Sequence, residues 1–200
     1  MKVIEKVTGY KKIKFFTHEN AGYGEVNLPE MQMHTTSFWL TLPEAVVATL
    51  PAARAEVVDA LRGFGHALET VACVALMCDP RDLGRTLGDG EDDGAAPGRD
   101  PLGKRTGGFD PTLFLFDSVP GGVGLAERVY ERAAELVGRA RQLVATCGCK
   151  AGCPACVGPG EGDSRRKELA LAVLDALGFG APAERAPRAA RGAVPVVTAP

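Results

Sequence analysis

The chain has 200 residues, 46% hydrophobic and 24% charged, which is the composition of a soluble globular protein with one core. Its formal net charge of −2 excludes a polycation, so any contact with nucleic acid has to come from local basic patches. The N-terminus has no apolar signal region, and the longest apolar run, 71–77, is too short to span a bilayer. We therefore expect a cytoplasmic protein without a membrane partner, in a compartment that disfavours disulfides.

The N-terminal part predicts strands, and the next part predicts a helix. Residues 2–42 contain alternating or β-forming stretches, with ENAGYG and LPE as turns between them. His34 and Trp39 are interpreted as packing residues. From residue 52 the apolar period becomes helical, which predicts one long helix over 52–77, buried in its apolar second half.

The second half of the chain predicts a loop, a strand and two helices. Residues 88–108 are rich in Gly, Asp and Pro, which predicts a flexible acidic insertion loop. TLFLFD at 112–117 predicts a buried strand, and a helix of about 22 residues is expected over 122–145. A last helix over 164–177 would be capped by Asp163 or Ser164 and closed by Gly178. The tail, 181–200, is expected to be disordered. The predicted fold is α/β, a β-sheet flanked by long helices.

Four cysteines lie within ten residues in the pattern C-x-C-x3-C-x2-C: Cys147, Cys149, Cys153 and Cys156. Four thiolates make a closed tetrahedral set for Zn²⁺, and the glycines and the proline among them allow the chain to turn. We predict one structural zinc, in a knuckle that joins the last two helices. An iron–sulfur cluster, a redox pair and plain core cysteines are the alternatives, although the spacing differs from the bacterial ferredoxin run. Cys73 and Cys78 are predicted to be buried free thiols.

Two other groups of residues are candidates for a site. In FDSVPGGVGLAE, Gly121 and Gly122 stand between a strand and a helix, where they form either a tight structural turn or a backbone contact with a DNA phosphate. The run has no lysine and is not a P-loop. His66, Asp82 and Asp117 would suit hydrolysis or metal binding if they converge, but a buried hydrogen-bond network explains the same residues without chemistry.

Basic residues form three clusters: Lys11, Lys12 and Lys14; Arg139, Arg141 and Lys150; Arg165, Arg166 and Lys167. Each cluster can be a solvated face. The second and third flank the cysteines, so a surface for the DNA backbone there is the competing hypothesis, with Arg165, Arg166 and Lys167 as contacts.

Five stretches of the chain occur in the order of one known domain: KVTGYKKIKFFTHENAGYGEVNLPEMQMHTTSFWL, GFGHAL, CDPRDLG, LFLFDSVPGGVGLAERV and CGCKAGCPACVG. On these motifs residues 1–178 resemble the C-terminal zinc-binding region of MrfA-type superfamily-two helicases, the mitomycin-repair-factor family, long known as a domain of unknown function. The domain would occupy residues 1–180. The most specific part is DSVPGGVGL followed by the cysteine pattern.

The resemblance implies that the four clustered cysteines hold zinc and that the domain packs on an ATP-driven, 3′-to-5′ DNA helicase in DNA repair. The sequence contains no G-x-x-x-x-G-K-[ST] and no DEAD or DEAH box, so we do not expect it to hydrolyse ATP by itself. We expect a non-catalytic accessory domain whose partners are DNA and a helicase motor in another domain or subunit. The alternatives are a hydrolase or nuclease using His66, Asp82 and Asp117, and a protein-interaction module of an anti-phage system.

Overall fold

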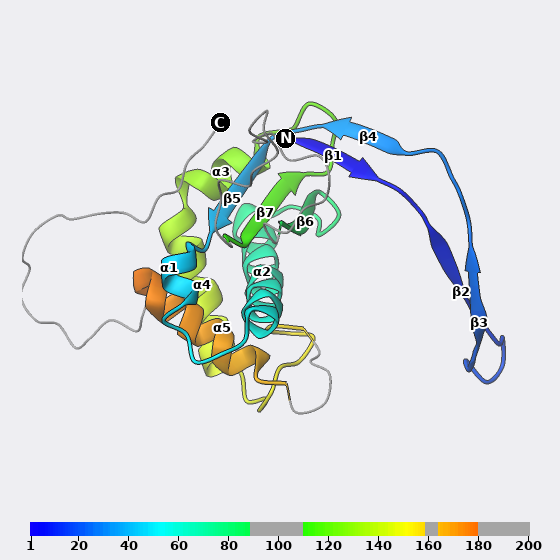
Figure 1. Ribbon diagram of the computed structural model, residues 1–200. Coiled ribbons are helices and arrows are strands. Elements are labelled where there is room, and N and C mark those ends of the chain that lie inside the picture. The colour runs from blue at the N-terminus through cyan, green and yellow to red at the C-terminus, as the bar shows by residue number, and fades with distance from the viewer. Residues whose placement is uncertain (89–109, 159–163, 180–200) are drawn as a thin grey trace, which may run out of the picture.

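The computed structural model describes residues 1–88, 110–158 and 164–179. These residues form a body of helices around a small sheet, and a long two-stranded arm that projects from the body (Figure 1). The predicted insertion loop, apart from Gly88, and the predicted tail lie outside the described residues.

The arm consists of two antiparallel strand pairs in succession. Strand β1 (Lys2–Glu5) pairs with β4 (Met31–His34), and β2 (Gly9–Ile13) pairs with β3 (Asn20–Glu25). The prediction of a turn at ENAGYG is wrong, because this segment is β3. Its glycines are compatible with a strand because the ring of Tyr10 lies across Gly24, where a Cβ would be 2.5 Å from Tyr10 Cζ.

The sheet of the body has three antiparallel strands in the order β5–β7–β6. These are β5 (Ser37–Thr41), β6 (Leu83–Gly88) and β7 (Thr112–Asp117). The strand predicted at 112–117 is confirmed as β7, whereas β6 was not predicted. In β7 the buried side chains of Leu113, Leu115 and Asp117 alternate with half-buried ones, so one face of the sheet lies against the helices.

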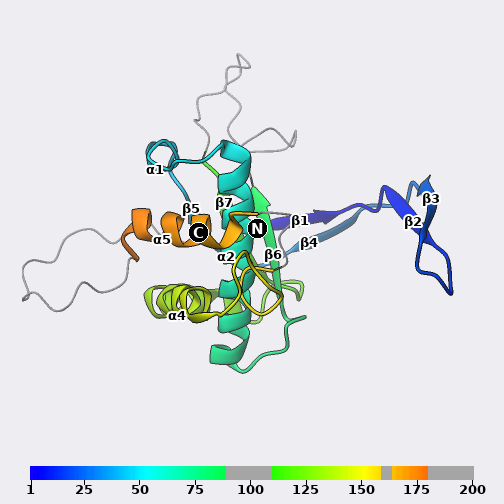
Figure 2. The ribbon, with the colours of Figure 1, turned by 90° about the horizontal axis from the view of Figure 1, so that it is seen from below.

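The helices are α1 (Glu44–Val47), α2 (Arg54–Leu76), α3 (Leu125–Glu131), α4 (Ala133–Thr146) and α5 (Arg166–Leu174), which continues into a π-helical turn at Asp175–Phe179. Within the described residues, none of the helices is both long and apolar enough to cross a membrane. Together with the sheet, these helices confirm the mixed α/β fold. Figure 2 shows α2 running through the body, with α4 and α5 on one side of it.

The predicted long helix over 52–77 is confirmed as α2, with one correction. Its second half is not fully buried, because Val74 is 75% exposed and Met77, which follows the helix in a left-handed conformation, is 93% exposed. An apolar sequence alone did not show that this side of the helix is left exposed by the part of the chain that the structure describes. The buried residues of α2 include Leu61, Phe64 and Leu68, which fill the centre of the core.

The helix predicted over 122–145 is two helices, α3 and α4. The break is at Arg132, whose φ of −108° departs from helical geometry. The Arg132 guanidinium donates a hydrogen bond to the Ala75 carbonyl, near the end of α2, and pairs with Glu135. The break therefore coincides with a contact between Arg132 and the end of α2. The apolar pattern of residues 122–145 did not reveal this contact.

Two of the predicted end residues, Ser164 and Gly178, lie on either side of the last helix. Ser164 Oγ accepts a hydrogen bond from the Arg166 amide at the start of α5, and Gly178 has a left-handed φ of +82° within the turn that follows the helix. Asp163 lies outside the described residues. The prediction that His34 is a packing residue is wrong, because its side chain is exposed, whereas Trp39 is half-buried on the sheet.

Candidate metal centre

The four clustered cysteines converge on one point after α4. Their sulfur atoms all lie within 4.8 Å of one another. The contacts are Cys147–Cys149 at 3.6 Å, Cys147–Cys153 at 3.5 Å, Cys149–Cys156 at 3.4 Å and Cys153–Cys156 at 3.6 Å. A tetrahedral Zn²⁺ with Zn–S bonds of about 2.3 Å separates its sulfurs by roughly 3.8 Å. The cluster therefore has the size of a single-ion site, with no room for several iron atoms and sulfides.

The local backbone favours thiolates in this cluster. A hydrogen bond from the Cys149 amide is the main cause that lowers the pKa of Cys147 to about 7, and the sulfurs of Cys153 and Cys149 contribute further. Burial raises the pKa of Cys156, which is the most enclosed of the four. A divalent cation would offset that desolvation, because zinc binds the deprotonated thiol.

The cysteine turn, residues 147–158, is held by side chains from two helices. His66 of α2 shares a hydrogen bond of 2.7 Å between its Nε2 and the Pro154 carbonyl. Lys167 of α5 donates from its Nζ to the carbonyl oxygens of Cys147, at 2.5 Å, and Cys149, at 2.8 Å. These contacts fix the carbonyls beside three of the thiols. They are outer contacts of the kind that orient metal ligands.

The motif GFGHAL explains how α2 approaches the cysteine turn so closely. A Cβ on Gly63 would lie 2.8 Å from Arg166 Cδ and 2.9 Å from Val157 Cβ. Two residues further on, and therefore on the nearly opposite face of the helix, a Cβ on Gly65 would lie 2.6 Å from Leu113 Cδ1 of the sheet. The two glycines therefore let one helix pack against both the cysteine turn and the sheet, with His66 beside the first of them.

Arg166 of α5 also contacts α2 beside the cysteine turn. Its guanidinium donates two hydrogen bonds to the Asp59 carboxylate of α2, at 2.7 and 2.5 Å, and the arginine side chain is only 14% exposed. A two-pronged pair of this kind fixes the geometry as well as the contact. The start of α5 is thereby fixed to α2 on one side and, through Lys167, to the cysteine turn on the other.

The other two cysteines have a different environment. Cys73 is buried in α2, as predicted, whereas Cys78 is half-buried rather than buried. Burial raises the pKa of the Cys73 thiol to about 12, and the neighbouring Cys78 adds to the shift. Both cysteines lie outside the group of four converging sulfurs, which suits core residues and not ligands of that site.

The glycine-rich turn before α3 surrounds an internal anion. The Asp117 carboxylate, fully buried at the end of β7, accepts hydrogen bonds from four successive backbone amides: Val123 at 2.5 Å, Gly124 at 2.8 Å, Leu125 at 3.2 Å and Ala126 at 2.7 Å. The amides at this helix N-terminus are thus occupied by the protein's own carboxylate. Gly121 and Gly122, both with positive φ, donate to His34 and Val119 carbonyls.

His66, Asp82 and Asp117 each have a separate set of hydrogen-bond partners among the described residues. His66 is bound to the cysteine turn, and Asp117 to the amides that precede and begin α3. Asp82 Oδ2 accepts from the Asp79 amide in the turn before β6. The polar atoms of the three side chains are therefore engaged in three local contacts, and this geometry offers no support for the hydrolase alternative.

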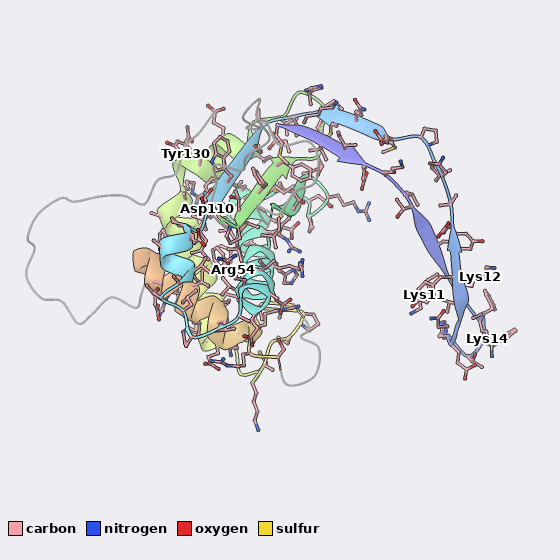
Figure 3. The ribbon with its side chains drawn as sticks, in the orientation of Figure 1. Lys11, Lys12, Lys14, Arg54, Asp110 and Tyr130 are labelled. Carbon is pink, nitrogen blue, oxygen red and sulfur yellow. The ribbon has the colours of Figure 1, made fainter. Side chains whose placement is uncertain are left out.

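The structure also gives partners to most of the predicted basic clusters. Arg139 pairs with Glu135, Arg141 with Asp175 and Arg165 with Glu168. Arg166 and Lys167 have the structural contacts described above, and Lys150 is exposed. Lys11, Lys12 and Lys14 lie at the far end of the arm, away from the helices (Figure 3).

The chain is similar to a known domain family and to two other proteins. The family model described as the MrfA Zn-binding domain matches residues 64–157, from the middle of α2 to the end of the cysteine cluster. Over 170 residues the chain is 34% identical to YprA of Bacillus subtilis, an uncharacterized ATP-dependent helicase, covering 85% of this chain and 20% of that protein. A stretch of 45 residues, 22% of this chain, is 40% identical to an uncharacterized protein of Methanocaldococcus jannaschii and covers 40% of it.

Two crystal structures of the DUF1998 helicase MrfA share the fold. The structure bound to DNA has a TM-score of 0.60 and 32% identity, covering 88% of this chain and 21% of the helicase. The structure bound to DNA and AMPPNP has a TM-score of 0.51 and 32% identity, covering 84% and 20%. The chain thus spans about one fifth of the length of the helicases it matches.

The fold and the four converging thiols define a zinc-binding domain with one structural zinc. Its family is that of the MrfA zinc-binding domain, and the resemblance noted from the sequence motifs is confirmed. Sequence reasoning had found the four cysteines, but it had not assigned His66, Lys167, Asp59 and Arg166 to the support of their turn. The motif GFGHAL was the available signal for the first of these.

Proposed function

We propose that this chain acts as a non-catalytic, zinc-stabilised accessory domain of an MrfA-type superfamily-two DNA helicase. The observation that carries the proposal is the likeness of most of the chain, with 32% identity, to a part of a helicase whose crystal structure is described as bound to DNA. Its partners are a helicase motor, in another domain or subunit, and DNA. Its setting is DNA repair in the cytoplasm, and the domain extends over residues 1–180.

The zinc ligands in this proposal are Cys147, Cys149, Cys153 and Cys156. Four thiolates leave no open position for a water or a substrate, so the ion would be structural and supply folding energy. The turn it closes lies between the end of α4 and the start of α5. Zinc therefore holds together the two helices that pack side by side on α2.

Among the predicted DNA contacts, Arg165 is the best placed. Its side chain is 43% exposed and its partner Glu168 is 65% exposed, so a phosphate can replace that carboxylate at little cost. Arg166 and Lys167 would have to abandon contacts that hold the cysteine turn. Gly121 and Gly122 would have to present amides that already donate within the protein. We therefore place the phosphate contact of this end of the body on Arg165.

Two measurements on the full chain test the proposal. Elemental analysis of protein purified without added metal should give one zinc per chain; iron with sulfide, or no metal, would overturn the zinc assignment. Titration with fluorescent DNA at about 50 and 200 mM salt should show binding that weakens with salt. Arg165→Glu should reduce that binding, with Arg128→Glu, the same charge reversal at an exposed position of α3, as the control. Absence of DNA binding at both salt concentrations would favour the protein-interaction alternative.

A further inference from the structure

The arm, residues 1–34, has no core of its own. Each of its residues is exposed or half-buried, and most of the exposed large hydrophobic side chains among the described residues belong to it. Its base is attached to the body by backbone contacts, including one from the Gly121 amide to the His34 carbonyl. Because a lone two-stranded ribbon is only marginally stable in water, a surface of this kind is expected to gain stability from a partner.

Aromatic rings concentrate at the arm tip, residues 10–24. Phe15 and Phe16 occupy the turn between β2 and β3, are 86% and 90% exposed, and meet edge to face with ring centroids 5.2 Å apart. Tyr10 and Tyr23 lie on the adjoining strands, and both line a shallow hollow in the ribbon. Four flat rings are thus exposed to solvent. They belong to β2, β3 and the turn between them, which lie at the end of the arm away from the helices (Figure 1).

The charge of the arm tip is positive although the whole chain is slightly acidic. Three lysines and one glutamate give the tip a formal charge of +2. Glu19 pairs with Lys14 at 2.8 Å. Lys12 lies 5.8 Å from the centroid of the Tyr10 ring, and Lys11 stands opposite Tyr23 in the strand register. The tip therefore carries one ammonium group close to an exposed ring, and a second lysine directly across the ribbon from another ring.

From these observations we infer that the arm tip binds single-stranded nucleic acid. Exposed rings stack on unpaired bases, and neighbouring ammonium groups neutralise the phosphates between them. The complementary charge of the tip selects a polyanion over an ordinary apolar protein surface. This inference rests on the proposed function and extends it, because it assigns a DNA-contacting surface outside the zinc centre.

The side chains of the arm tip favour a single strand over a duplex. Besides lysine, which serves both roles, reading of base edges in a groove relies on the forked donors of Arg, Asn and Gln. The tip contains no arginine or glutamine. Its Asn20 already accepts a hydrogen bond from the Gly22 amide through Oδ1. Rings and lysines remain, and these recognise unpaired bases and phosphates with little dependence on sequence.

The test uses the full chain with two fluorescent probes, an oligothymidine of about 20 nucleotides and a duplex of equal length, each titrated at about 50 and 200 mM salt. The double variant Phe15→Ser/Phe16→Ser should weaken binding of the oligothymidine about 10-fold or more, with a much smaller effect on the duplex. Lys11→Gln/Lys12→Gln should reduce the salt slope for the single strand by about 1.4, or about 0.7 for each phosphate contact.

Matched controls separate the arm tip from the rest of the protein. Lys2→Gln/Lys6→Gln makes the same charge change at the base of the arm, and Val74→Ser/Met77→Ser removes two exposed apolar side chains from the body. Both should leave oligothymidine binding unchanged. If the unaltered chain binds DNA and the tip variants bind equally well, the inference fails while the proposed function stands. If the unaltered chain binds neither probe, the DNA part of the proposed function fails too.

Discussion

The body and the arm of this protein differ in where their side chains find contacts. Side chains of the body contact one another, whereas many side chains of the arm face water. In the body, the buried Asp117 carboxylate has four amide donors, and the Arg166–Asp59 pair and the Lys167 ammonium are engaged in internal contacts. In the arm, rings such as Phe15 and Phe16 remain in water. The comparison teaches that the zinc-bearing body can be specified by its own residues, whereas the arm is the region in which a partner is expected.

The largest expected effect is loss of zinc from the body. Cys153→Ser removes one of the four proposed ligands, and structural zinc in small domains is worth about 10–16 kcal/mol, as much as the whole stability of a typical domain. We expect the variant to lose its zinc and its cooperative thermal transition, measured by elemental analysis and circular dichroism. Cys78→Ser is the control, because Cys78 lies outside the cluster. Unchanged zinc content in Cys153→Ser would contradict the ligand assignment.

The second effect concerns the internal anion. Asp117→Ala leaves the four amides at the start of α3 without their acceptor, and we expect the free energy of unfolding to fall by about 3–5 kcal/mol. Urea denaturation measures the change. Asp82→Ala removes a side chain that accepts from one amide in an exposed turn, so a loss of about 1 kcal/mol is expected there. If the two variants lose the same free energy of unfolding, burial of the Asp117 carboxylate does not account for its contribution to stability.

The third effect compares one substitution at two helical glycines. Gly63→Ala places a Cβ against Arg166 and Val157, and displacing them should cost about 1–3 kcal/mol. Gly138→Ala in α4 adds a Cβ that meets nothing within 4 Å, so it should stabilise the helix by about 0.5–1 kcal/mol. Thermal denaturation of both variants measures the opposite signs. Stabilisation by Gly63→Ala would mean that α2 does not pack closely on the cysteine turn.

A smaller effect is expected for the lysine that supports the cysteine turn. Lys167→Met removes the donor to the Cys147 and Cys149 carbonyls, and loss of such outer contacts weakens metal binding by about 10-fold or more. Competition with a zinc-binding dye gives the affinity. Lys150→Met makes the same change on an exposed side chain between two of the cysteines. The role of Lys167 is refuted if both variants hold zinc equally well.

The smallest effect on stability is expected in the arm. Phe15→Ser/Phe16→Ser replaces rings that are almost fully exposed, so the free energy of unfolding of the body should change by less than about 0.5 kcal/mol. Urea denaturation of the chain without DNA is the measurement. A loss of more than about 2 kcal/mol would show that the tip packs on the body in solution, and would remove the contrast between the two regions.

Much of the fold could be predicted where a local pattern is sufficient. The strand at 112–117, the long helix α2 and the left-handed conformation of Gly178 follow from apolar period and glycine chemistry, which act over a few residues. The errors lie where distant segments meet. The break at Arg132 accompanies a contact with Ala75, and the strand at ENAGYG depends on pairing with β2 and on the Tyr10 ring.

The sequence by itself was enough to predict the zinc centre, because four soft ligands within ten residues can reach one ion whatever the rest of the fold does. It also indicated the family, through five motifs that occur in the order of one known domain. Only the tertiary structure decided that His66 and Lys167 support the cysteine turn, and that Asp117 occupies the amides of the glycine-rich turn. The physical reason is the distance along the chain over which each interaction acts. The spacing of the four cysteines is a local property of the sequence, whereas His66 meets the Pro154 carbonyl, 88 residues away, only because the folded chain packs α2 against the cysteine turn.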